Sequence, residues 1–152
     1  MNCKVIYHTT TGNTRKVAEA IAAAVGTVAL PIENSPPADA ADLLFIGDGF
    51  YAGTVHKEMK EFIKSLKGSS IKKAAVFSTF GGQDKANAVL KKLLGDQGIP
   101  VAPECFSCPG KAWWIFNRKH PTGQELSAAK DFALKLAKSQ QLATLKETGV
   151  FP

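Results

Sequence analysis

Thr9-Thr10-Thr11-Gly12-Asn13-Thr14 joins an apolar run, Lys4 to His8, to a helix-period segment that ends near Val25. Four hydroxyl groups and one carboxamide in this stretch can donate hydrogen bonds, and Gly12 permits a tight turn. The N–H groups of a helix start point to the same place, where they favour negative charge. A single hydroxyl would suffice if the stretch only capped the helix. The stretch therefore predicts a strand, a phosphate-binding loop and a helix, in that order.

Apolar runs alternate with helix-period segments along most of the chain. The apolar runs span Lys4 to His8, Thr27 to Ile32, Leu43 to Gly47, Lys73 to Ser78 and Val101 to Phe106. The helix-period segments span about Thr14 to Val25, Met59 to Leu66 and Ala86 to Leu94, and a last one starts at Thr122. This alternation predicts an α/β fold with three layers, a doubly wound five-stranded parallel sheet covered by helices on both faces. Ligands of such sheets bind at the carboxyl ends of the strands, where the strand order reverses.

The length of 152 residues fits one domain, which we expect over residues 1–140, followed by a polar tail over residues 141–152. The 19 basic residues outnumber the 13 acidic ones, but they are spread over several predicted helices. We therefore expect no nucleic-acid partner. No apolar segment approaches the roughly 18 residues of a membrane span, and no secretory signal is visible before the first strand. The sequence thus predicts a cytoplasmic monomer that does not contact a membrane.

Two common nucleotide-binding motifs do not account for the threonine-rich loop. The phosphate-loop string G-x-x-x-x-G-K-[ST] does not occur in the sequence. Gly47 to Ala52 matches the dinucleotide pattern G-x-G-x-x-[GA], but aromatic residues delay the following helix. The region Lys67 to Lys73 also lacks the acidic residue that would bind a ribose hydroxyl. We interpret this match as chance, and the exclusions favour a phosphate monoester.

Aromatic residues stand beside glycines in the loops after the third and fourth predicted strands. Phe50 and Tyr51 lie between glycines, and Phe80 precedes two more. Glycine lets the backbone approach the edge of a flat ring, and aromatic side chains can stack on its faces. An alternative is that these aromatic residues cover the ends of the core. Beside a phosphate site, the pattern favours a pocket for a conjugated ring.

A phosphate and a flat ring together lead to a known family. Val5 to Thr14 resembles the flavodoxin signature, in which an apolar strand with a tyrosine leads into [ST]-x-T-G-x-T. Gly47 to Gly53 and Ser78 to Gly82 match the positions of the two flavodoxin loops that flank the flavin ring. The resemblance covers about residues 3–138. It implies flavin mononucleotide (FMN) as the cofactor and the strand order 2-1-3-4-5.

The resemblance also implies which residues bind the cofactor. The phosphate ligands would be Thr9, Thr10, Thr11, Gly12, Asn13 and Thr14. The ring would contact Phe50, Tyr51, Ala52, Gly53, Thr79, Phe80, Gly81 and Gly82. The implied function is electron transfer to or from a partner oxidoreductase, with no catalytic residues of the chain's own. Two alternatives stay open: a flavodoxin-fold NAD(P)H-dependent quinone or flavin reductase, and an interaction module without flavin.

Three further features of the sequence are a cysteine pair, an aromatic loop and the histidines. Cys105 and Cys108 have C-x-x-C spacing, but no second pair completes a metal site, and we expect structural thiols at the sheet edge. Aromatic residues in the long loop that follows could pack into the core or dock the redox partner. These aromatic residues are Trp113, Trp114 and Phe116. The histidines His8, His56 and His120 show no ligand or triad spacing, so we assign them no chemistry and expect no metal site.

Overall fold

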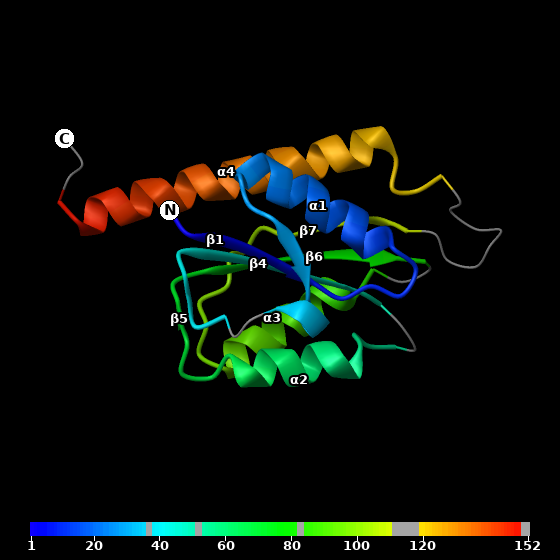
Figure 1. Ribbon diagram of the computed structural model, residues 1–152, viewed down its shortest axis with the longest axis horizontal. Helices are drawn as coiled ribbons and strands as arrows, with labels where there is room; N and C mark the ends of the chain where they lie inside the picture. Colours follow the sequence, from blue (N-terminus) through cyan, green and yellow to red (C-terminus); the bar gives the residue numbers. More distant parts are fainter. Residues whose placement is uncertain (36–37, 51–52, 82–83, 111–118, 150–152) are drawn as a thin grey trace.

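The computed structural model describes residues 1–35, 38–50, 53–81, 84–110 and 119–149. Five parallel strands form the main sheet in the order β2-β1-β4-β6-β7 (Figure 1). Their bounds are β1 Cys3–Tyr7, β2 Ala29–Pro31, β4 Leu43–Gly49, β6 Ala74–Phe80 and β7 Phe106–Pro109. This is the predicted order 2-1-3-4-5, which is therefore confirmed.

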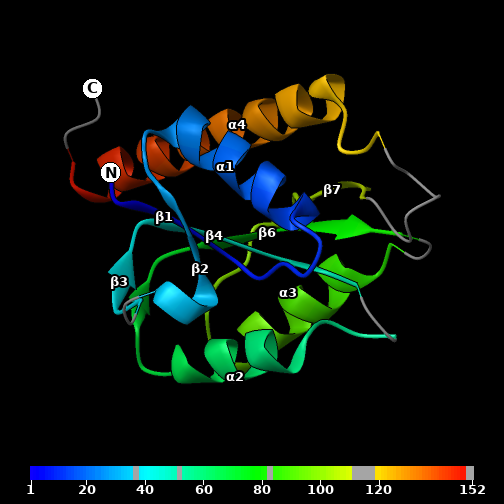
Figure 2. The same ribbon diagram turned by 45° about the vertical axis from the view of Figure 1, so that its right-hand side comes forward.

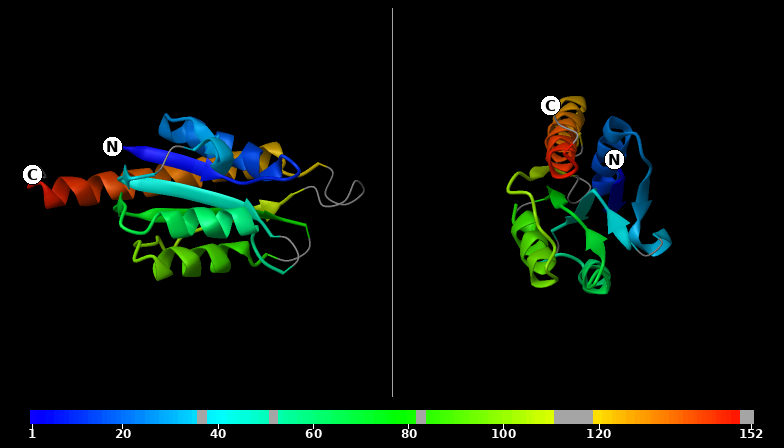
Figure 3. Two further views of the ribbon diagram at one scale, coloured as in Figure 1. Left: turned by 60° about the horizontal axis from the view of Figure 1, so that its bottom comes forward. Right: turned by 90° about the vertical axis from the view of Figure 1, so that its left-hand side faces the viewer.

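Helices cover both faces of the sheet, and a view along the strands shows the three layers (Figure 3). One face carries α1 (Asn13–Val25) and α4 (Gly123–Glu147), and the other carries α2 (Lys57–Ser65) and α3 (Ala86–Asp96). A short 3-10 helix, η1 (Ile32–Asn34), follows β2. Two further strands, β3 (Ala40–Ala41) and β5 (Ser70–Ile71), pair in a small sheet that the sequence did not predict.

The central strand β4 is buried on both faces because its side chains alternate between two hydrophobic clusters. Leu44 and Ile46 pack with α2 and α3, whereas Leu43 and Phe45 pack with α1 and α4. This explains the continuous apolar run in the sequence, since a strand covered on both sides has no polar face. Gly47 ends the run because a Cβ at this position would overlap the ring of Phe77 in β6. The packing of Phe77 thus requires glycine at this position, and β4 itself continues to Gly49.

The fifth predicted strand was misplaced. We expected it at Val101 to Phe106, but β7 begins at Phe106 and Val101 forms only an isolated bridge with Ala74. Pro103 interrupts the segment, because proline has no N–H to donate to a neighbouring strand. Apart from that bridge, the chain pairs with β6 at the edge of the sheet only after Pro103.

Helix α4 continues to Glu147, beyond residue 140, where the sequence analysis placed the end of the domain. Residues 141–147 include Leu, Ala, Lys and Glu, which favour helices even without an apolar stripe. No helix in the described ranges, this long one included, has both the length and the apolar character needed to cross a membrane. The cores of α1, α2 and α3 agree with the predicted segments.

Candidate functional site

The threonine-rich loop turns from β1 into α1 at Gly12. Gly12 adopts φ 88°, the left-handed region that glycine enters without steric cost. Its N–H donates to Thr9 Oγ1 at 2.9 Å, and Asn13 Nδ2 donates to Thr11 Oγ1 at 2.8 Å. Among the described residues no side chain caps this helix, and its first turn contains no acidic residue. The loop is therefore ordered by its own hydroxyls, and the positive end of α1 is not neutralised by a carboxylate.

A pair of buried threonines ties this loop to the end of β6. Thr14 Oγ1 and Thr79 Oγ1 lie 2.9 Å apart, and both residues are buried. The carbonyl oxygen of Thr79 in turn accepts a hydrogen bond from the N–H of Phe50, at 3.3 Å. Three segments named in the sequence analysis, the loops after β1, β4 and β6, therefore meet at the carboxyl ends of neighbouring strands. This is the expected location of a ligand site in such a sheet.

Gly110, which the sequence analysis did not select, closes this region from the side of β7. Its N–H donates to the carbonyl oxygen of Phe80 at 2.9 Å. A Cβ at this position would lie 3.1 Å from atoms of both Asn13 and Thr79. The threonine-rich loop and Gly110 are almost a hundred residues apart, so no local sequence pattern indicates their contact. The close approach of Asn13 and Thr79 to Gly110 becomes visible only in the packed structure.

The residues expected around the ring are placed only in part. Phe50 is half-buried and packs against the cluster beneath α2 and α3, which agrees with the alternative that it covers the core. Phe80 is also half-buried, and Gly53 and Gly81 are exposed. The other residues of these predictions lie outside the described residues. They are Tyr51, Ala52 and Gly82, together with the proposed docking residues Trp113, Trp114 and Phe116.

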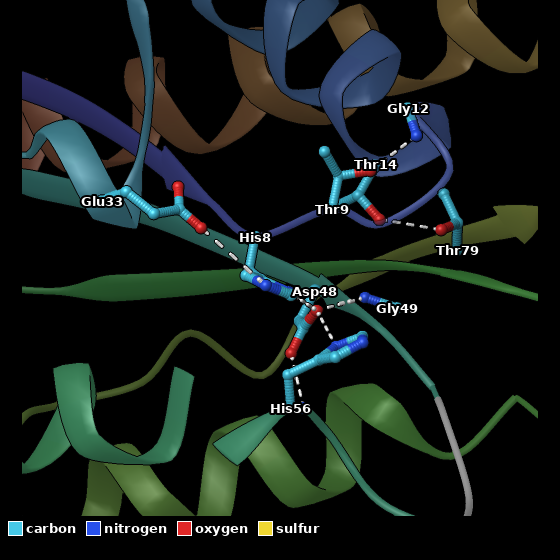
Figure 4. A network of polar contacts seen from close by, with 9 residues as sticks. All are labelled: His8, Thr9, Gly12, Thr14, Glu33, Asp48, Gly49, His56 and Thr79. Atoms are coloured by element: carbon cyan, nitrogen blue, oxygen red, sulfur yellow. Dashed lines mark hydrogen bonds and ion pairs between the residues drawn. The ribbon is translucent and has the colours of Figure 1, made fainter. Parts of the chain in front are cut away.

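Two histidines converge on a buried carboxylate beside the threonine-rich loop (Figure 4). Asp48 Oδ1 lies 3.2 Å from His8 Nδ1 and 2.8 Å from His56 Nδ1. The N–H of Gly49 also donates to Oδ1, at 2.7 Å, and the N–H of His56 donates to Oδ2, at 2.9 Å. This cluster was not predicted from the sequence. The available signal was that His8 and Asp48 stand at the carboxyl ends of two strands that the predicted order places side by side.

The cysteines differ in exposure. Cys105 is exposed, whereas Cys108 lies in the edge strand β7 and is buried. Burial, assisted by the charges of Glu125 and Asp84, raises the pKa of the Cys108 thiol to about 12. A thiol with such a pKa is a poor nucleophile near neutral pH. This agrees with a structural role for Cys108 at the sheet edge.

Comparisons with known proteins agree on one family. A sequence profile described as the flavodoxin domain matches residues 4–95. An uncharacterized protein of Methanocaldococcus jannaschii is 30% identical over 148 residues, which cover 90% of this chain and 95% of that protein. The coenzyme F420H2 oxidase of Methanothermobacter marburgensis is 30% identical over 149 residues, and this match spans 88% of the chain but only 34% of the oxidase.

A comparison of folds gives the same result. The structure of a flavodoxin from the domain Archaea superimposes with a TM-score of 0.80 and 19% sequence identity. The match covers 93% of this chain and 99% of that one. At this identity the likeness concerns the fold. Since both chains are covered almost entirely, the similarity extends to the whole three-layer sheet.

Proposed function

The chain belongs to the flavodoxin domain family, and from this we propose that it binds FMN non-covalently and transfers electrons to or from a partner protein. The flavin would supply the redox chemistry, and the chain would supply binding and orientation. The threonine-rich loop supports this role. It resembles the flavodoxin signature, and the fold around it matches that of flavodoxins.

The observation that carries the proposal is the start of α1. The helix begins after Gly12, its first turn has no acid, and hydroxyls of Thr9, Thr11 and Thr14 lie around it. A phosphate monoester is a dianion at neutral pH, and both the helix end and neutral donors stabilise it. Arg15 and Lys16 are exposed and belong to the helix surface. The donor set therefore fits a terminal phosphate such as that of FMN.

The ring end of the site is proposed from the two loops after β4 and β6. The hydrogen bond from Phe50 to Thr79 brings these loops together next to the Thr14 and Thr79 hydroxyls. A ligand whose phosphate occupies the start of α1 would extend its ring toward these loops. We propose that the backbone from Phe50 to Gly53 and from Thr79 to Gly82 borders that ring, as the family resemblance implies.

The absorption spectrum of the purified full chain tests the proposal. We expect one FMN per chain, released on heating as the mononucleotide. Stepwise reduction should then show two separate one-electron steps, which suit a carrier. Direct bleaching by NAD(P)H without a second protein would instead indicate the reductase alternative. A chain that neither purifies with FMN nor binds added FMN would contradict the proposal and favour the interaction module.

A further inference from the structure

We propose that His8, Asp48 and His56 form a binding site for one divalent transition-metal ion. The ligands would be Nδ1 of both imidazoles and Oδ1 of the carboxylate. The site uses none of the threonine donors, and its metal binding can be tested without bound flavin. It connects the end of β1, the end of β4 and the residue before α2. It thereby joins both ends of the loop that runs from β4 to α2.

The first argument is the spacing of the ligand atoms. The two nitrogen-to-oxygen distances are 3.2 and 2.8 Å, and the three ligating atoms all lie within 4.8 Å of one another. Bonds of about 2.0–2.2 Å in a tetrahedral zinc site place neighbouring ligand atoms about 3.3–3.6 Å apart. Both nitrogen-to-oxygen distances lie below this range, and the 4.8 Å limit for the whole set lies above it. Small side-chain rotations would therefore allow all three atoms to bind one ion.

The second argument concerns the lone pairs of Asp48 Oδ1. Three nitrogen atoms approach this one oxygen, from Gly49 at 2.7 Å, His56 at 2.8 Å and His8 at 3.2 Å. A carboxylate oxygen offers about two lone-pair positions. If an ion lies among the three side chains, the Gly49 N–H uses one position and the ion uses the other. The imidazole Nδ1 atoms then direct their lone pairs to the ion instead of competing for the oxygen.

The third argument is burial. Asp48 is 0% exposed and His8 is 7% exposed, so this carboxylate is held away from water. A buried carboxylate is costly unless positive charge and hydrogen bonds compensate it. A divalent ion supplies that charge. Two imidazoles with one carboxylate suit transition metals such as zinc, cobalt, nickel or iron better than magnesium or calcium.

The surroundings resemble the outer contacts that orient metal ligands. Asp48 Oδ2 accepts the N–H of His56, which fixes the carboxylate plane. Glu33 Oε1 in η1 lies 3.9 Å from His8 Nε2, on the side of the ring opposite to Nδ1 (Figure 4). A carboxylate behind a ligating imidazole is a frequent feature of metal sites, and its removal typically lowers metal affinity about 10- to 100-fold. A side-chain rotation that closes this 3.9 Å gap to hydrogen-bond distance would make Glu33 a positioning residue in this proposal.

Metal titration of the full chain, prepared without a histidine tag, tests the site. Zn²⁺ is titrated by calorimetry, and the metal retained after dialysis is quantified. Co²⁺ serves as a spectroscopic probe of tetrahedral coordination. We expect one ion per chain. The variants Asp48→Asn and His8→Gln should lose this stoichiometric ion, and Glu33→Gln should bind it about 10-fold more weakly.

Two control variants separate this site from other metal ligands. His120 Nδ1 contacts Glu125 Oε1 at 2.7 Å, a histidine–carboxylate pair outside the cluster, so His120→Gln should retain the ion. Cys105→Ser tests the exposed thiol and should also retain it. Circular dichroism checks that each variant is folded. If Asp48→Asn does not fold, His8→Gln and His56→Gln decide the question.

Either of two results would overturn the proposal. One is the absence of stoichiometric Zn²⁺ and Co²⁺ binding by the unmodified chain. The other is an ion that folded His8→Gln and His56→Gln variants retain with unchanged affinity. The cluster would then be a set of hydrogen bonds that share protons. The FMN content of the same samples is measured separately, so failure of the metal site is distinguishable from failure of flavin binding.

Discussion

Helices α1 and α4 lie side by side on one face of the sheet, yet they begin in opposite ways (Figure 2). At the start of α4, Thr122 Oγ1 accepts the N–H of Glu125, and the Glu125 carboxylate accepts the N–H of Thr122. This capping box satisfies the helix end with the chain's own side chains. At the start of α1 the N-cap residue is Gly12, and no carboxylate stands in the first turn.

Under the proposed function, one chain uses the same helix property for stability at α4 and for phosphate binding at α1. Every helix start presents N–H groups and partial positive charge. The residues at α4 provide an internal anion and complete the helix. The residues at α1 provide hydroxyl groups, a glycine turn and no anion, so the same positive end remains available to an external phosphate. We therefore expect substitutions at the two helix starts to affect different measurements.

The largest effect is expected from Thr11→Asp, which gives α1 the internal negative charge that α4 already has. The new carboxylate should repel the FMN phosphate by about 3 kcal/mol, or about 100-fold in affinity. The stability of the flavin-free chain should stay the same or rise slightly, since a negative charge near a helix N-terminus stabilises the helix. Quenching of flavin fluorescence measures the first effect, and thermal unfolding measures the second.

The matched control for this change is Thr122→Asp at the start of α4. Aspartate is also a good N-cap residue, so this variant should keep both its stability and its FMN affinity. Thr11→Ser keeps the hydroxyl and should bind FMN normally. If Thr11→Asp binds FMN as tightly as the unmodified chain, the phosphate does not lie at the start of α1.

A smaller effect is expected from Thr14→Val, which removes one hydroxyl of the Thr14 and Thr79 pair while keeping its shape. Loss of a hydrogen bond to a charged group costs about 1.5 kcal/mol or more, so FMN affinity should fall about 10-fold. Stability should also fall, because the Thr79 hydroxyl loses its buried partner. Adding Thr79→Val should recover stability without recovering FMN affinity. Recovery of both would mean that the pair serves only the core.

The contrast between the helix starts was largely predictable from local sequence. The α4 capping box follows from Thr122 and Glu125 at the required spacing, and the loop at α1 follows from its hydroxyls and Gly12. Four of the five apolar runs likewise coincide with strands of the main sheet, because parallel strands alternate in the chain with the helices that cover them. These features depend on residues that are neighbours in the chain.

Features that depend on distant residues were not predictable in this way. His8 and Asp48 are 40 positions apart, and the contact between them exists only once β1 and β4 pair. Gly110 matters because the folded chain brings it against Asn13 and Thr79. The strand after α3 was misplaced because Pro103 breaks an apolar run that otherwise has the right composition. The strand order limits which residues can be neighbours across the sheet, but it does not specify the positions of their side chains.

A change in stability alone is expected from Thr122→Ala at the start of α4. Loss of the capping box should cost about 1 kcal/mol, or about 2–4 °C in melting temperature for a chain of this size. FMN affinity should not change, because no residue of this cap takes part in the proposed site. A clear loss of FMN affinity at a temperature where the variant is folded would contradict the separation between the two helix starts.

The smallest effect is expected from Glu125→Gln, which removes the negative charge that the start of α4 carries and the start of α1 lacks. Burial chiefly raises the pKa of Cys108, and the charge of Glu125 adds to it. Glu125→Gln keeps the capping hydrogen bonds and removes this charge. Alkylation followed by mass spectrometry at pH 8 should modify the exposed Cys105 and spare Cys108. In Glu125→Gln the rate of Cys108 modification should rise by less than about tenfold. A tenfold rise would correspond to a pKa lower by one unit, and burial, the larger cause of the raised pKa, remains.

The same thiol determines the sign of a dependence on alkaline pH. The pKa of Cys108 is about 12 in the folded chain and 9.0 for an ordinary thiol, so the folded state holds a proton that the unfolded state releases. Its contribution to stability is complete below about pH 9 and is lost as the pH rises toward 12. Cys108→Ala should therefore reduce the alkaline loss of stability measured by urea unfolding, whereas Cys105→Ser should not. If the pH dependence of stability is unchanged in Cys108→Ala, the thiol ionises at the same pH in the folded and the unfolded chain. Neither burial nor the carboxylate of the α4 cap would then raise its pKa.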